Sequence, residues 1–144
     1  MTRSTIALLA VLCAVARSTS AQGVVSGTLR LQTETPAAGA TVAPPFAISG
    51  WALDQIATAG SGIDAVHVWA VPNPGSGAAP VFFGAAAIGL ARPDVAAAFG
   101  PAGATSGYSV TGTLPPGVYD LIVFARSRVT GTFNNSLTVR VTVR

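Results

Sequence analysis

The strict alternation of apolar and other side chains near the end of the chain constrains the fold most. One face of the segment 118–128 carries apolar side chains at four successive alternate positions: Tyr119, Leu121, Val123 and Ala125. The segment 136–143 repeats the pattern with Leu137, Val139, Val141 and Val143. A period of two belongs to β-strands with one buried face, since successive side chains of a strand point to opposite sides. The loop 131–135 between the two segments predicts a hairpin.

Five further segments contain β-branched or aromatic residues between turn-forming residues: 24–33, 46–53, 63–71, 81–90 and 107–114. Proline and glycine at 44–45, 72–75 and 115–117 favour turns. Neither a helix interior nor a central strand tolerates such runs of proline and glycine. One helical turn is expected at 92–99, where Pro93 suits the first helical position. Seven or eight short strands in about 120 residues predict an all-β fold, a single β-sandwich of antiparallel strands.

Residues 1–21 have the pattern of a secretion signal. Arg3 supplies a positive charge, and residues 6–16 form an uninterrupted apolar run. That run has the length of a signal-peptide core and is well short of the ~20 residues that a membrane-spanning helix needs. Small residues at Thr19 and Ala21 predict cleavage before Gln22. We therefore expect a signal peptide at 1–21 and one domain at 22–144, secreted, periplasmic or at the cell surface, without membrane insertion after cleavage. The alternative is an uncleaved N-terminal anchor.

Much of the basic character of the chain belongs to that signal segment. The whole chain has a net charge of +3, from eight arginines and five acidic residues. Without Arg3 and Arg17, six arginines face five acidic residues, a net charge of +1. This charge attracts phosphate weakly, so we expect no nucleic-acid partner. The only cysteine, Cys13, lies in the same segment, so the domain has no disulfide and depends on one hydrophobic core.

Five stretches carry a resemblance to a known family: 50–54, 62–69, 91–99, 106–108 and 114–119, among which Arg-Pro-Asp-Val-Ala at 92–96 is the most specific. Over about residues 35–144 the chain resembles bacterial immunoglobulin-like domains, which are modules of secreted and cell-surface proteins. The resemblance implies an immunoglobulin-like β-sandwich and this compartment. It also implies that Tyr119 hydrogen-bonds back to the chain, as a tyrosine at this place does in such sandwiches. It implies no activity, because one fold hosts many functions.

An enzyme is the less favoured class. A Ser-His-Asp arrangement would need His67, the only histidine, which lies between two valines of an expected strand, and no Gly-x-Ser-x-Gly elbow occurs. The acidic residues are scattered over different segments, and Asp54 and Asp64 lack the run of oxygen ligands typical of calcium loops. We expect no catalytic residue, metal or cofactor. The alternative is a small hydrolase or metal-dependent enzyme centred on His67, which requires a neighbouring acid and a concave pocket.

Four of the six remaining arginines lie on the last two expected strands or directly after them: Arg126, Arg128, Arg140 and Arg144. If the apolar faces of the hairpin coincide, Arg126 lies roughly opposite Arg140 on the outer face, which is unfavourable for like charges. The favoured interpretation is that these charges protect the C-terminal strand as an open edge of its sheet. The other interpretation is a binding role.

The strand expected at 63–71 offers a candidate binding face. In an immunoglobulin-like order it lies beside the strand 118–128. One register turns Val66, Val68 and Ala70 inward, which leaves an outer face with His67, Trp69, Ile122, Phe124, Arg126 and Arg140. The opposite register buries Trp69 in the core. Periodicity leaves both open, because this strand is apolar on both faces.

These patterns favour a non-catalytic module for protein association, adhesion or structural support. Aromatic residues together with arginine on an exposed sheet are typical of protein interfaces. An exposed tryptophan can also stack on a sugar ring, so a module that binds a cell-surface glycan is the second hypothesis. The other tryptophan, Trp51, is expected in the core, in a strand where Gly50 marks a bulge.

Overall fold

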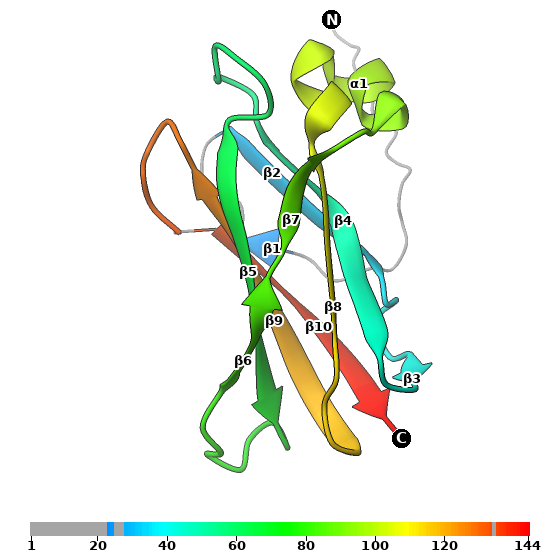
Figure 1. The fold of residues 1–144 in the computed structure, drawn as a ribbon. Helices are drawn as coiled ribbons and strands as arrows, with labels where there is room; N and C mark the ends of the chain where they lie inside the picture. Colours follow the sequence, from blue (N-terminus) through cyan, green and yellow to red (C-terminus); the bar gives the residue numbers. More distant parts are fainter. Residues whose placement is uncertain (1–22, 25–27, 134) are drawn as a thin grey trace, which may run out of the picture.

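Two β-sheets pack face to face in the computed structural model, which describes residues 23–24, 28–133 and 135–144 (Figure 1). The six-stranded sheet has the order β1 (Gly23–Val24), β10 (Asn135–Val143), β9 (Gly117–Ser127), β5 (Ile63–Pro72) and β6 (Val81–Ala85), with β3 (Thr41–Val42) also paired to β10. The four-stranded sheet has the order β2 (Leu29–Thr35), β4 (Phe46–Asp54), β8 (Gly107–Gly112) and β7 (Ala87–Leu90). The expected signal peptide lies outside the described residues.

The core between the sheets confirms a β-sandwich. Both alternating segments form strands whose apolar rows are buried, as the period of two predicted. In the described part of the chain, eight of ten strands have four or more residues, and all pairings are antiparallel except that of β3 with β10. The expected helical turn is confirmed as α1 (Pro93–Phe99), which a 3₁₀ turn at Pro101–Thr105 follows before β8. The Tyr119 hydroxyl donates a hydrogen bond to the Pro115 carbonyl at 2.7 Å, as the resemblance implied.

The segment 81–90, expected as one strand, forms two strands in different sheets. β6 pairs with β5, and β7 pairs with β8. Between them the Ala86 N–H donates to the Val66 carbonyl at 2.8 Å. The chain approaches the four-stranded sheet at Gly84, where a Cβ atom would lie 2.9 Å from Val110 Cγ2. Glycine thus permits a change of sheet that the apolar run itself does not signal.

The expected hairpin register was wrong, because the turn forms closer to β9. Asp120, not Arg126, lies opposite Arg140. The Gly131 N–H donates to the Ser127 carbonyl at 2.7 Å, and Gly131 takes a positive φ of 71°. This turn centres the hairpin about three residues earlier than expected. Arg126 faces Ala65 of β5 instead, so the predicted repulsion between the two arginines does not arise.

The prediction that the C-terminal strand is an open edge was also wrong. β1 pairs with the start of β10, and β3 pairs with its end in parallel. Between these strands the Gly39 N–H donates to the Arg140 carbonyl at 2.7 Å. The arginines of β10 therefore do not serve an exposed edge. In the described sheet the outermost strand on the opposite side is β6.

Trp51 and Gly50 also differ from expectation. Trp51 is half-buried on the outer side of β4, where its ring packs against Phe99 of α1 at a centroid distance of 5.3 Å. The bulge lies in the partner strand β2, between Thr33 and Thr35. Gly50 serves a close approach, because a Cβ atom there would lie 2.0 Å from the Gln32 carbonyl oxygen.

A buried carboxylate joins three segments at one end of the sandwich. Asp54 is 2% exposed and accepts hydrogen bonds from the Thr28 hydroxyl at 2.5 Å, the Ser127 hydroxyl at 2.7 Å and the Ile56 N–H at 3.2 Å. Burial alone would raise the pKa of Asp54, but the three hydrogen bonds together lower it below its ordinary value. The ionised carboxylate thus holds the ends of β4 and β9 to the chain before β2.

Replacement of Asp54 tests this junction. Because its pKa is lower in the folded than in the unfolded state, the stabilisation is present above about pH 4 and is lost as the pH falls through the folded pKa. Asp54→Asn should lower the free energy of unfolding by about 1–3 kcal/mol at neutral pH and reduce its dependence on acidic pH. Urea unfolding at a series of pH values measures both effects. Asp94→Asn, at a side chain 65% exposed, should cost less at neutral pH. Equal acid sensitivity of wild type and Asp54→Asn would contradict this role.

Candidate functional site

The outer side of the six-stranded sheet carries a cluster of aromatic side chains. The inward residues of β5, Val66, Val68 and Ala70, are at most 1% exposed, so alternation turns His67 and Trp69 outward. Trp69 is 36% exposed, which settles the register that the sequence left open. The ladder with β9 sets His67 opposite Phe124 and Trp69 opposite Ile122.

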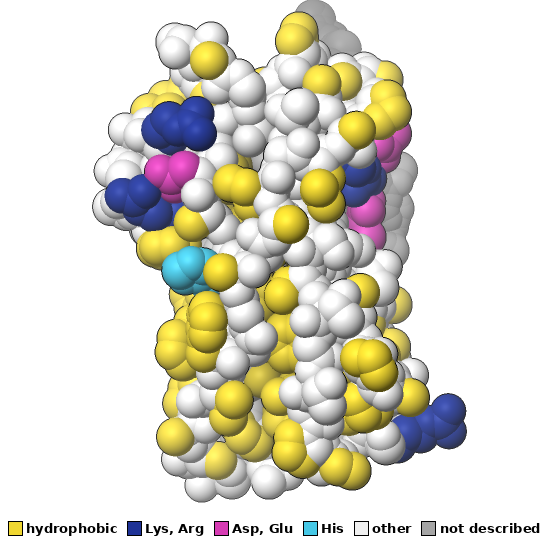
Figure 2. Space-filling model, viewed as in Figure 1, with side chains coloured by type: hydrophobic (Ala, Val, Ile, Leu, Met, Phe, Trp, Pro, Cys, Tyr) yellow, Lys and Arg dark blue, Asp and Glu magenta, His cyan; other side chains and the backbone are white. Residues whose placement is uncertain are grey.

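Ring contacts make this cluster continuous. The ring of Phe82 meets that of Trp69 edge-on at a centroid distance of 5.0 Å and that of His67 at 5.6 Å. Phe133 packs on the other side of His67 at 4.8 Å. Figure 2 shows hydrophobic side chains gathered around and below the histidine. We call this surface the aromatic face and define it by six residues: His67, Trp69, Phe82, Ile122, Phe124 and Phe133.

Phe82 and Phe133 were not predicted for this face. Phe82 faces outward beside Trp69, and Phe83 is the extra residue of a bulge in β6 that turns it inward against Phe46, at a centroid distance of 5.2 Å. Two adjacent phenylalanines in an expected strand were the available signal, because one of them must face outward. Phe133 lies in the loop after β9, and no local pattern links it to His67.

A shallow depression of about 330 Å³ lies within the aromatic face. Its lining residues are Trp69, Pro80, Ile122 and Phe124, none of which has an ionisable side chain. Such a surface can accept an apolar side chain from another molecule. It offers few hydrogen-bond partners to a sugar.

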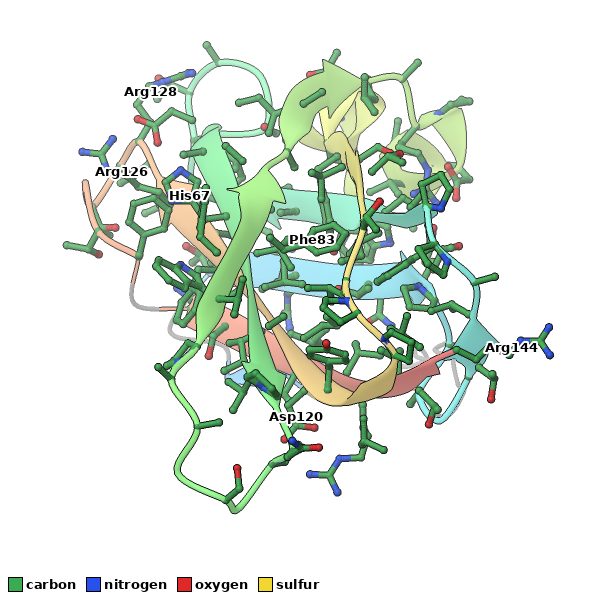
Figure 3. All side chains as sticks on the ribbon, turned by 60° about the horizontal axis from the view of Figure 1, so that its bottom comes forward. His67, Phe83, Asp120, Arg126, Arg128 and Arg144 are labelled. Carbon is green, nitrogen blue, oxygen red and sulfur yellow. The ribbon has the colours of Figure 1, made fainter. Side chains whose placement is uncertain are left out.

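Two ion pairs flank the aromatic face. At one end Arg126 Nη1 lies 2.6 Å from an oxygen of Asp64. At the other end Arg140 donates two hydrogen bonds to the Asp120 carboxylate, at 2.8 and 3.0 Å, and this contact raises the pKa of Arg140. Figure 3 shows Asp120 and Arg126 at opposite ends of β9, with His67 beside Arg126. The structure thus brings five of the six predicted face residues together and sets Arg140 at the far end.

His67 is surrounded by rings rather than by acids. Among the described residues it contacts Phe82 and Phe133 and makes no hydrogen bond or ion pair. Asp54 is hydrogen-bonded within its junction, and Asp64 pairs with Arg126. In the described part of the chain no three His, Cys, Asp or Glu residues are grouped to hold a metal ion. Within the described residues, no carboxylate makes a hydrogen bond or ion pair with His67.

No protein-family model matches the chain, and no curated protein matches its sequence. Within residues 23–24, 28–133 and 135–144, no helix is long and apolar enough to cross a membrane.

The exposure of Trp69 can be measured by fluorescence. Trp51→Phe leaves Trp69 as the only tryptophan, and its emission should be quenched by iodide because the indole ring is 36% exposed. Trp69→Phe leaves Trp51, which should be quenched less because Phe99 covers it. Blue-shifted emission that iodide does not quench in the Trp51→Phe variant would rule out the aromatic face as an accessible surface.

Proposed function

We propose that this chain is a secreted or cell-surface, non-catalytic immunoglobulin-like module that binds a protein through its aromatic face. The strand order supports the immunoglobulin-like assignment. In chain order, the first, second, sixth and fifth of the eight longer strands form one sheet as β2-β4-β8-β7, and the other four form β10-β9-β5-β6. Constant-type immunoglobulin domains have the same order for seven of these strands, and β6 is an additional strand beside β5, at the place where variable-type domains add a strand. The signal pattern at 1–21 supports secretion.

The continuous ring contacts among Trp69, Phe82, His67 and Phe133, three of which are exposed, are the observation that carries the proposed binding function. Four of the ten aromatic residues of the chain lie on this face: Trp69, Phe82, Phe124 and Phe133. Exposed apolar patches on secreted domains mark interaction sites. Protein interfaces combine such an apolar centre with a charged or polar rim, and here the ion pairs Arg126–Asp64 and Arg140–Asp120 form the rim.

The chemistry of the face favours a protein over a glycan. A bound sugar needs polar partners beside the ring on which it stacks, because its hydroxyl groups lose water on binding. The depression beside Trp69 is lined by Trp69, Pro80, Ile122 and Phe124, whose side chains offer a sugar no hydrogen-bond partner besides the indole N–H of Trp69. An apolar or aromatic side chain of a protein loses no hydrogen bonds there.

Binding by face variants tests the proposal. The purified protein is screened against secreted and surface proteins of its own source and against a glycan array, and each binder is then measured by surface plasmon resonance. Trp69→Ala and Phe82→Ala should each weaken binding about tenfold or more, as truncated aromatic anchors do.

Ile88→Ala is the matched control, because Ile88 on β7 is as exposed as Trp69 but lies in the other sheet. Its affinity should equal that of wild type. A protein binder that is insensitive to both face variants would contradict the proposal. Binders found only on the glycan array would favour the carbohydrate-binding alternative.

A further inference from the structure

Along the outward row of β9, the sign of the charge differs between the two ends. Alternation places five side chains on the outer side: Val118, Asp120, Ile122, Phe124 and Arg126. Asp120 carries a negative charge near one end, Arg126 carries a positive charge at the other, and two apolar residues lie between them. The seven residues from Asp120 to Arg126 span about 20 Å of strand.

This pattern is complementary to itself when reversed. If a second copy lies on the face with its β9 antiparallel to the first, Arg126 of each copy lies over Asp120 of the other. Ile122 then lies over Phe124 in both directions. A two-fold axis produces this reciprocity, since residue i contacts j while j contacts i. A parallel arrangement would instead set Asp120 over Asp120.

Both charged ends retain capacity for a further partner. Arg126 spends one of its five N–H donors on Asp64, and its side chain is 37% exposed. The Asp120 carboxylate accepts two bonds from Arg140 and has lone pairs for more, with 20% of its side chain exposed. Each end holds an ion pair, and the exposed Arg128 adds a positive charge beyond Arg126. In the antiparallel arrangement this end meets the pair Asp120–Arg140 of the other copy, which has no net charge, so two ends of like net charge do not meet. The net charge of +1 for residues 22–144 adds little repulsion at longer range.

The size of the apolar centre shows why the charged ends matter. The outer sides of β9, β5 and β6 cover roughly 14 Å by 20 Å, about 280 Å² in projection. A stable interface buries about 800 Å² on each partner. The area of about 280 Å² already includes both charged ends and is well below this value, so the contact is weak, and the charges at its ends select its direction.

We infer that the aromatic face binds a second copy of this chain, face to face, with the two β9 strands antiparallel. This inference rests on the proposed function and names the partner of the same face. The aligned strands of packed sheets cross at about 30°, which displaces the ends of this short span by about 5 Å, a distance that an arginine side chain can bridge. The dimer is weak and forms at high local concentration, as for modules crowded on a surface.

Sedimentation velocity on the purified protein tests the inference between about 1 µM and about 1 mM, the range expected for a small interface. Wild type should change from monomer to dimer within this range. Arg126→Asp gives a face with acids at both ends, and Asp120→Arg gives one with arginines at both ends. Each variant alone should dimerise about tenfold or more weakly, because like charges meet at both ends. An equimolar mixture of the two variants should form a heterodimer with restored affinity.

Circular dichroism and urea unfolding establish that each variant is folded, and Ile88→Ala should dimerise as wild type does. Wild type that stays monomeric up to 1 mM overturns the inference, even if the charge variants fail to fold. A dimer that persists in both variants, or a mixture that gains no affinity, also overturns it. If wild type is monomeric while Trp69→Ala still abolishes binding of another protein, self-association alone is wrong and the proposed function stands.

Discussion

Burial of the inward row of β9 is the constraint on which the rest of the structure depends. Its four residues, Tyr119, Leu121, Val123 and Ala125, are at most 5% exposed and lie at the centre of the six-stranded sheet, between β10 and β5. Each large side chain in such a row contributes about 1.5–3 kcal/mol by leaving water. A shift of one residue would expose the whole row, so the register is fixed. The outward row is fixed with it, and Ile122, Phe124 and Arg126 have no other direction in which to point.

The alternation of side chains between the two sides of a strand explains how much of the fold was predictable. β10 has one apolar and one polar row, and the outward row of β9 carries Asp120 and Arg126 where its inward row carries no charge, so the direction of both strands could be inferred from the residues alone. β5 is apolar on both sides, and its direction depends on neighbours from distant segments. The hairpin register depends on one turn hydrogen bond, from Gly131 to Ser127, which no pattern in the strands specifies. The division of 81–90 between two sheets depends on the approach of Gly84 to Val110, a contact between residues 26 positions apart.

The same alternation predicted part of the candidate site. Alternation brought His67, Trp69 and Phe124 to one face, whereas Phe82 needed the pairing of β6 with β5 and its bulge. This part of the chain also shows which surface is open to partners. Residues 65–91 contain no Asp, Glu, Lys or Arg, so charge does not protect the outermost strand β6. Pro80 before the strand and the bulge within it do so instead. The face, rather than the edge, is left for contact.

Backbone amide chemical shifts, recorded by NMR as the protein concentration is raised, test most directly whether the aromatic face is a contact surface. The account predicts concentration-dependent shifts along the facing parts of β5, β6 and β9, strongest near Trp69, Phe82 and Phe124. The strands β2, β4, β8 and β7 should keep their shifts throughout. Changes confined to the four-stranded sheet, or no change on the aromatic face at any concentration, would contradict the account.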